Sequence, residues 1–171
     1  MIEKNSTQGL EKVSLPDCLV NWERPLYELA IKNNVTIERI AIKYNQAYFH
    51  NKDVKQEVAK FNLPSLALLK ELYGYRKTIG WLMIQLQSLN EFCGKRIAMT
   101  EVQMESIADI MLQEYPHVTL PRVLAFFHYF KAGKYGMFYG DIDPMKITSS
   151  IHEWFTIDMH KVIKEYNDKH I

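Results

Sequence analysis

The sequence predicts an all-α protein, a compact multi-helix domain of about six helices with a long central helix. Apolar residues recur at the i, i+3, i+4 spacing of a helix face along most of the chain. Helix-capping residues stand before several of these stripes, and glycine, asparagine or proline stands where most of them end. Because the two kinds of signal agree, we expect helices throughout.

Composition limits the classes to which the protein can belong. The chain has 171 residues, of which 47% are hydrophobic and 24% charged, enough apolar material for the core of one domain. The longest apolar runs, such as residues 81–84, are far shorter than a membrane span. Residues 1–6 show no secretory signal, and two cysteines, Cys18 and Cys93, are too few for a disulfide framework. We therefore expect a cytoplasmic protein without membrane association.

The N-terminal part contains a tail and three short helices. Residues 1–20 are expected to form a tail or an extended arm. A first helix begins at Pro25, because proline is tolerated in the first turn, and carries the apolar stripe Leu26, Leu29 and Ala30. Thr36 is a suitable N-cap for a second helix that runs to about Phe49, and a short third helix is expected over about 54–60.

The longest periodic stretch opens at Pro64 and Ser65. Either one helix spans about 65–93 or two helices meet near Gly74. We favour one long helix, because no proline or polar cluster breaks the run. Gly94 is expected to end it as the C-terminal glycine, so residues 21–94 would form an N-terminal helical subdomain and residues 95–171 a C-terminal one.

The C-terminal part has the clearest start signals. Thr100 and Gln103 fit a capping box for a helix that ends near Tyr115. Thr119 is expected to cap the next helix, over about 120–132, whose mostly apolar sequence indicates a buried helix rather than a DNA-reading one. Asp143 followed by Pro144 opens a last helix to about residue 168, with these residues facing inward: Ile147, Ile151, Trp154, Phe155 and Val162.

The loop before the last helix is the strongest candidate for a binding site. It is punctuated by Gly133, Gly136 and Gly140, and a basic–aromatic cluster stands in and beside it: Lys131, Lys134, Tyr135 and Tyr139. Such a cluster fits stacking on a base and contact with a phosphate, and it equally fits a rigid corner whose tyrosines pack between two helices. A second basic cluster is expected near the same subdomain edge: Arg76, Lys77, Lys95 and Arg96.

Charge is unevenly distributed along the chain. Residues 1–99 carry 14 Lys and Arg against 10 Asp and Glu, a net of +4, and residues 100–171 carry 7 against 10, a net of −3. This asymmetry fits a basic face for an acidic partner or for phosphates, and it equally fits an ordinary solvated surface.

Motifs for catalysis are weak. Histidine and cysteine spacings match no zinc site, and no P-loop or nucleophile-elbow pattern occurs. Cys93 ends an apolar stripe and is best explained as structural, although Lys95 and Arg96 stand close to it in sequence. Asp141 and Asp143 are best explained by a turn and an N-cap. We expect no enzymatic activity, cofactor, metal or small-molecule substrate.

One segment resembles a known family. Residues 99–155 contain Met99, Thr100 and Gln103 before a helix that ends in Tyr115, then an aromatic helix and the run KAGKYGMFYGDIDP. This segment resembles a family of small uncharacterised proteins from Bacteroides-type bacteria and their phages and mobile elements. The arrangement looks similar to small phage helicase-loader or replisome-organiser proteins.

The resemblance implies a role rather than a chemistry. It suggests a non-enzymatic adaptor or accessory protein in DNA replication of a phage or mobile element, which would bind a protein partner through residues 131–143. That partner would be a replication protein or a second copy of the chain, and nucleic acid is an open alternative ligand. A phage assembly factor or an inhibitor of host defence is the alternative function.

Overall fold

The computed structural model describes residues 16–171, so most of the expected N-terminal arm lies outside the described range. Within that range the chain is helical and contains no β-strand, which confirms the all-α class. The helical segments are more numerous than the about six that were expected. In chain order they are α1 (Glu23–Lys32), α2 (Ile37–Lys43), α3 (Val54–Ala59), α4 (Leu66–Tyr73), α5 (Tyr75–Cys93), α6 (Glu101–Glu114), α7 (Leu120–Lys131), α8 (Pro144–Glu153), the π-helical turn η1 (Trp154–Asp158) and α9 (Met159–Lys169).

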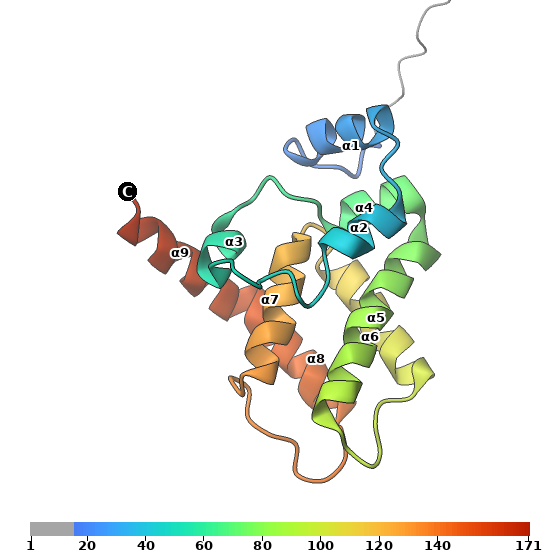
Figure 1. Ribbon diagram of the computed structural model, residues 1–171, viewed down its shortest axis with the longest axis vertical. Coiled ribbons are helices and arrows are strands. Elements are labelled where there is room, and N and C mark those ends of the chain that lie inside the picture. Colours follow the sequence, from blue (N-terminus) through green and yellow to red (C-terminus); the bar gives the residue numbers. More distant parts are fainter. Residues whose placement is uncertain (1–15) are drawn as a thin grey trace, which may run out of the picture.

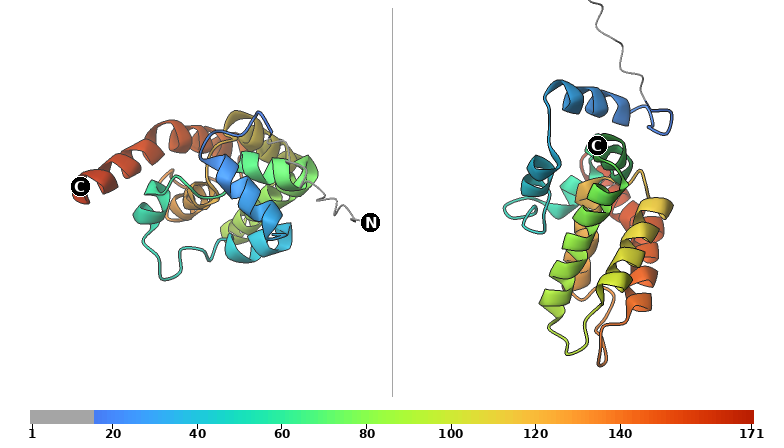
Figure 2. Two further views of the ribbon diagram at one scale, coloured as in Figure 1. Left: turned by 90° about the horizontal axis from the view of Figure 1, so that it is seen from above. Right: turned by 90° about the vertical axis from the view of Figure 1, so that its right-hand side faces the viewer.

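Most of the helices pack into a bundle, from which α1 and α9 stand apart in different places. Helix α5 packs against α6 and α7, and α6 packs against α8 (Figure 1). Helix α1 rests on α4 at one end of the molecule, and α9 extends outward with α3 packed on it (Figure 2). None of the helices in residues 16–171 combines the length and the apolar character needed to cross a bilayer.

Helix α7 is the centre of the core, as its mostly apolar sequence predicted. Val123, Ala125, Phe126 and Phe127 are completely buried, and Phe126 contacts the ring of Phe130 at a centroid distance of 5.6 Å. One cluster of buried residues extends from α2 to α9 around this helix. Burial of these aromatic side chains supplies a large part of the hydrophobic stabilisation.

The prediction of one continuous helix over 65–93 is wrong, because the helix is interrupted at Gly74. This residue has φ 89° and ψ 166°, a conformation that is essentially restricted to glycine, so α4 ends at Tyr73 and α5 begins at Tyr75. Gly80, by contrast, lies inside α5 without interrupting it. The helix ends at Gly94 in the left-handed conformation, as expected.

The second helix is shorter than expected because a side chain ends it. The amide of Asn45 donates to the backbone oxygen of Ile42 at 2.8 Å, and its Oδ1 accepts from the backbone nitrogen of Ala47 at 2.8 Å. These bonds compete with helical backbone bonds, so α2 ends at Lys43 rather than near Phe49.

The capping signals are confirmed with one exception. Thr100 and Gln103 form both bonds of the capping box, and Asp143 Oδ1 accepts from Met145 N at 2.9 Å before Pro144. Thr119 stands at the N-cap of α7, but its hydroxyl makes no capping bond. Its Oγ1 is buried, and it has no hydrogen-bond partner within residues 16–171.

The last helix runs without a break from Pro144 to Lys169, as expected, but it includes the π-helical turn η1. The expected inward-facing residues are all buried: Ile147, Ile151, Trp154, Phe155 and Val162. Trp154 also donates from Nε1 to the backbone oxygen of Arg122 at 3.0 Å, which ties η1 to α7. The π-helical turn therefore lies at a contact between the last helix and α7.

Candidate functional site

Two loops meet at the end of the molecule away from α1 (Figure 1). One, residues 94–100, joins α5 to α6, and the other, residues 132–143, joins α7 to α8. The backbone nitrogen of Ile142 donates to the oxygen of Ile97 at 3.1 Å, and Lys95 Nζ donates to the oxygen of Phe138 at 3.4 Å. We call this pair of loops, together with Phe92 at the end of α5, the tip.

The longer loop of the tip is held in place by buried side chains. Phe138 and Ile142 are 8% and 6% exposed and belong to the hydrophobic core. Gly136 has φ 85°, a left-handed conformation that favours glycine. The loop is therefore a fixed structure on a rigid scaffold, which is the usual placement of binding residues.

Tyr135 supports the rigid-corner hypothesis. Its ring packs near Phe126 and Phe130 at centroid distances of 6.1 and 6.2 Å, and its hydroxyl donates to Asp158 Oδ2 at 2.9 Å. Burial, and then the Asp158 carboxylate, raise the pKa of Tyr135 well above its ordinary value. This tyrosine joins the loop to η1 and is not free for a ligand.

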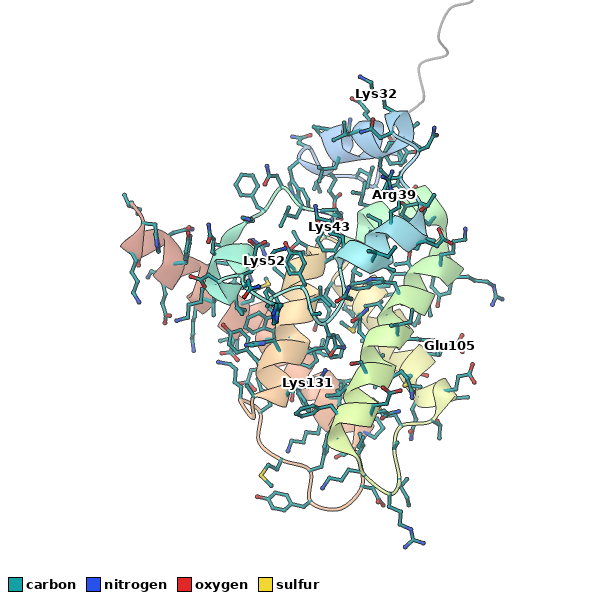
Figure 3. The ribbon with its side chains drawn as sticks, viewed as in Figure 1. Lys32, Arg39, Lys43, Lys52, Glu105 and Lys131 are labelled. Atoms are coloured by element: carbon teal, nitrogen blue, oxygen red, sulfur yellow. The ribbon has the colours of Figure 1, made fainter. Side chains whose placement is uncertain are left out.

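Lys131 also has partners inside the molecule. Its Nζ donates to Gln46 Oε1 and, at 3.3 Å, to Ser88 Oγ, and it lies 5.3 Å from the centroid of the Phe92 ring (Figure 3). Burial lowers the pKa of this ammonium. Lys131 thus joins α7 to α5 and to the segment after α2, and a ligand would have to compete for it.

The predicted residues that remain exposed at the tip are Lys134, Tyr139 and Arg96, whereas Lys95 is half-buried and bonds Phe138. Tyr139 is 96% exposed, and Lys134 is exposed with its Nζ 5.7 Å from the centroid of the Tyr129 ring. Lys95 and Lys131 line the same small cavity of about 200 Å³, beside Phe92 and Met137. The structure therefore brings part of the two predicted basic clusters together.

Arg76 and Lys77 do not belong to this site, and the expectation that they share an edge with Lys95 and Arg96 is wrong. They lie in the first turn of α5, whereas Lys95 follows its last residue. A helix of 19 residues rises about 1.5 Å per residue, so the two pairs stand roughly 27 Å apart. This separation does not depend on the break at Gly74, because one continuous helix over 65–93 would also place the two pairs at opposite ends of its second half.

The groups considered for catalysis have structural surroundings. Burial raises the pKa of the Cys93 thiol, against the smaller opposing effect of Lys95 and Lys131, so the thiol is held in its protonated form. Asp143 caps α8, and Asp141 is exposed beside it. Within residues 16–171, no three His, Cys, Asp or Glu side chains gather closely enough to hold a metal ion.

A buried polar cluster that no sequence pattern indicated lies at the opposite end of the molecule. Glu23 is completely buried at the start of α1. Its Oε1 accepts from Ser65 Oγ at 2.5 Å and lies 3.0 Å from His117 Nδ1, and its Oε2 accepts from Val20 N at 2.9 Å. A glutamate in a first turn is ordinarily exposed, so no local pattern in the sequence marks Glu23 as buried.

This cluster has the residue types of a catalytic triad without its geometry. A nucleophilic serine donates to the imidazole, which in turn donates to the carboxylate. Here Ser65 donates to the carboxylate directly, and its oxygen accepts from Leu68 N at 3.1 Å as the N-cap of α4. The cluster therefore joins α1 to α4 and to the loop before α7, and we name it the Glu23 latch.

Comparison with known proteins identifies one segment. Residues 98–170 match a family of unknown function, DUF6633. No curated protein and no solved structure matches the chain. The DUF6633 segment contains α6 to α9 and most of the tip, whereas α1, α2 and α4 lie outside it. It begins close to the expected subdomain boundary at 94/95, which stays a prediction.

Proposed function

We propose that this protein is a non-enzymatic adaptor that binds a protein partner through the tip. The observation that carries the proposal is the exposure of large apolar side chains on the two anchored loops and the adjoining end of α5. Tyr139 is 96% exposed, Met137 71%, Phe92 60% and Ile97 58%. Exposed apolar side chains that gather in this way are typical of interaction sites, because a partner that covers them removes apolar area from water.

Cations beside these apolar groups favour an acidic partner surface. Lys134 and Arg96 are exposed, and neither makes an ion pair within the described residues. Lys95 lines the cavity beside Phe92. A partner with carboxylates around an apolar centre would complement this arrangement. Nucleic acid, with phosphates and stacking bases, is the alternative ligand of the same chemistry.

The setting that we propose is DNA replication of a phage or mobile element in the cytoplasm. Its support is the resemblance of residues 99–155 to proteins of Bacteroides-type bacteria and their phages, and to phage helicase loaders. Residues 98–170 match DUF6633, a family of unknown function, so this match does not conflict with the proposed setting. In such a role the protein acts by contact rather than by chemistry.

The decisive experiment compares a tip variant with a matched control. The tagged full-length chain is cross-linked in its source cells, the lysate is treated with nuclease, and each captured protein is purified and titrated by calorimetry. The variant Met137→Ser/Tyr139→Ser should weaken binding at least about tenfold, whereas Ile42→Ser, at an apolar side chain of α2 that is 78% exposed, should change it less than about twofold.

Fluorescence anisotropy with single- and double-stranded DNA across a salt series tests the alternative ligand. Salt-sensitive binding that Lys95→Glu/Lys134→Glu abolishes would reassign the tip to nucleic acid. A symmetric oligomer that the tip variant dissociates would favour an assembly or host-interaction protein. Absence of a tip-dependent protein partner would contradict the proposed adaptor.

A further inference from the structure

A groove lies between α1, α2 and α4, outside the DUF6633 segment and away from the tip. Its volume is about 410 Å³. Leu26 and Leu29 of α1 form one wall, and Leu68 and Leu72 of α4 form the other. Arg39 and Lys43 of α2 stand at its rim.

The walls of the groove are apolar and incompletely covered. Leu26 packs against the cluster that contains Leu68, and Leu29, three residues later, lines the groove and is 54% exposed. Leu68, at the base, is 2% exposed. A half-exposed leucine that lines an apolar groove indicates a surface with room for further apolar side chains.

The charge at the rim is positive. Of the described residues that line the groove, Arg39 and Lys43 are the charged ones, and both are exposed. They lie four residues apart on α2, which places them one turn apart on the side of α2 that faces α1 (Figure 3). Neither makes an ion pair within residues 16–171. The groove therefore combines an apolar interior with two unpaired cations at a helical spacing.

We propose that this groove binds an acidic amphipathic helix of a partner protein. Apolar side chains at i, i+3 or i+4, and i+7 of such a helix would enter between α1 and α4. Carboxylates one turn apart beside them would meet Arg39 and Lys43. The inference goes beyond the proposed function, because the two surfaces share no residue and the groove would give the adaptor a second contact.

The probe is a fluorescein-labelled peptide helix of about four turns, with leucines at those positions and glutamates flanking them. Its counterpart carries lysine in place of each glutamate. Both are titrated by anisotropy into the full-length chain. The wild-type protein should bind the acidic peptide at least about tenfold more tightly than the basic one. In Arg39→Glu/Lys43→Glu this preference should reverse.

Control variants separate the groove from the rest of the molecule. Lys161→Glu/Lys164→Glu makes the same charge change at exposed positions of α9 and should leave binding of the acidic peptide unchanged. The tip variant Met137→Ser/Tyr139→Ser should also bind it normally, so failure of the tip proposal would not affect this one. Leu29→Ser, checked for folding by circular dichroism, should weaken binding without changing the charge preference.

Three results would overturn the inference. The first is that neither peptide binds at millimolar protein. The second is that both peptides bind equally to the wild-type chain, which would leave an apolar cavity without charge selection. The third is a concentration-dependent dimer in sedimentation that Leu29→Ser dissociates, because the occupant would then be a second copy.

Discussion

His117 and Glu23 are 94 positions apart in the chain, and His117 Nδ1 lies 3.0 Å from Glu23 Oε1. Through this contact the DUF6633 segment holds α1, which is one wall of the groove. Ser65 reaches the same carboxylate from the start of α4. The Glu23 latch thus joins three segments that are distant in sequence, and it positions the part of the protein that lies outside the matched family.

The buried contacts of the Glu23 latch predict a large loss of stability when Glu23 is substituted. Glu23→Ala should lower the free energy of unfolding by about 3 kcal/mol, because it leaves the buried hydroxyl of Ser65 and the partly buried backbone nitrogen of Val20 without their acceptor. Urea denaturation measures this change, and amide exchange in α1 measures a local opening. Glu28→Ala, at an exposed glutamate of the same helix, should change stability by less than about 0.5 kcal/mol. Equal effects of the two variants would contradict the latch.

Gly74 and Gly80, six positions apart, should respond in opposite directions to substitution by alanine. Gly74→Ala should destabilise the protein by about 2 kcal/mol, because φ 89° with ψ 166° is unfavourable for any side chain. Gly80→Ala should stabilise it by about 0.5–1 kcal/mol, since no atom lies within 4 Å of the added Cβ inside α5. Thermal unfolding of both variants is the measurement. A stabilising Gly74→Ala would mean that α4 and α5 can join.

Substitution by valine should have different effects on stability at two threonines that occupy N-cap positions. Thr100→Val should cost about 1 kcal/mol, because it removes the hydroxyl of the capping box. Thr119→Val should be neutral or stabilising, since it replaces a buried hydroxyl that lacks a partner in the described residues by a methyl group of similar shape. Chemical denaturation distinguishes these outcomes, and a destabilising Thr119→Val would reveal a bonding partner for that hydroxyl.

Substitution of Lys131 should lower stability, whereas substitution of Lys134 should not. Lys131→Met should lower the free energy of unfolding by about 1 kcal/mol, because its contacts with Gln46 and Ser88 are lost. Lys134→Met should leave stability within about 0.5 kcal/mol, since the side chain is exposed. Denaturation curves of the two variants test this. If both variants unfold like the wild type, Lys131 is a free surface lysine.

The raised pKa of Tyr44 predicts a loss of stability at alkaline pH. Burial, with a smaller contribution from Glu57, raises its pKa from 10.0 to about 12 in the folded protein. The unfolded chain therefore ionises first, so the stability that this phenol contributes is complete below about pH 10 and declines toward pH 12 by about 1.4 kcal/mol per pH unit. Urea titrations between about pH 9 and 12 should show a shallower decline for Tyr44→Phe. The matched variant Tyr139→Phe, at a side chain that is 96% exposed, should follow the wild type.

Local signals in the sequence predicted most helix starts correctly. The capping box at Thr100 and Gln103 and the Asp143–Pro144 start are confirmed, because each depends on hydrogen bonds within three residues. The inward face of the last helix is confirmed for the same kind of reason, since 3.6-residue periodicity places its apolar residues on one side.

The candidate site could be predicted only in part. The loop at 132–143 was identified from its glycines and aromatic residues, but the roles of its members were not separable. Tyr135 and Tyr139 are four residues apart, yet one bonds Asp158 and the other is 96% exposed. Lys131 has its partner at Gln46, 85 positions away. Contacts at such separations depend on how distant helices pack.

Short-range patterns in the amino-acid sequence are sufficient to predict the helical class, most helix starts and the residues that face the core. The choice between one helix and two at Gly74, the burial of Glu23 against His117 and the groove beside Arg39 and Lys43 became evident in the folded structure. The two groups of features depend on interactions of different range. Capping and periodicity act within one or two turns of chain, whereas the burial of a charge or the opening of a groove depends on segments that meet only after folding.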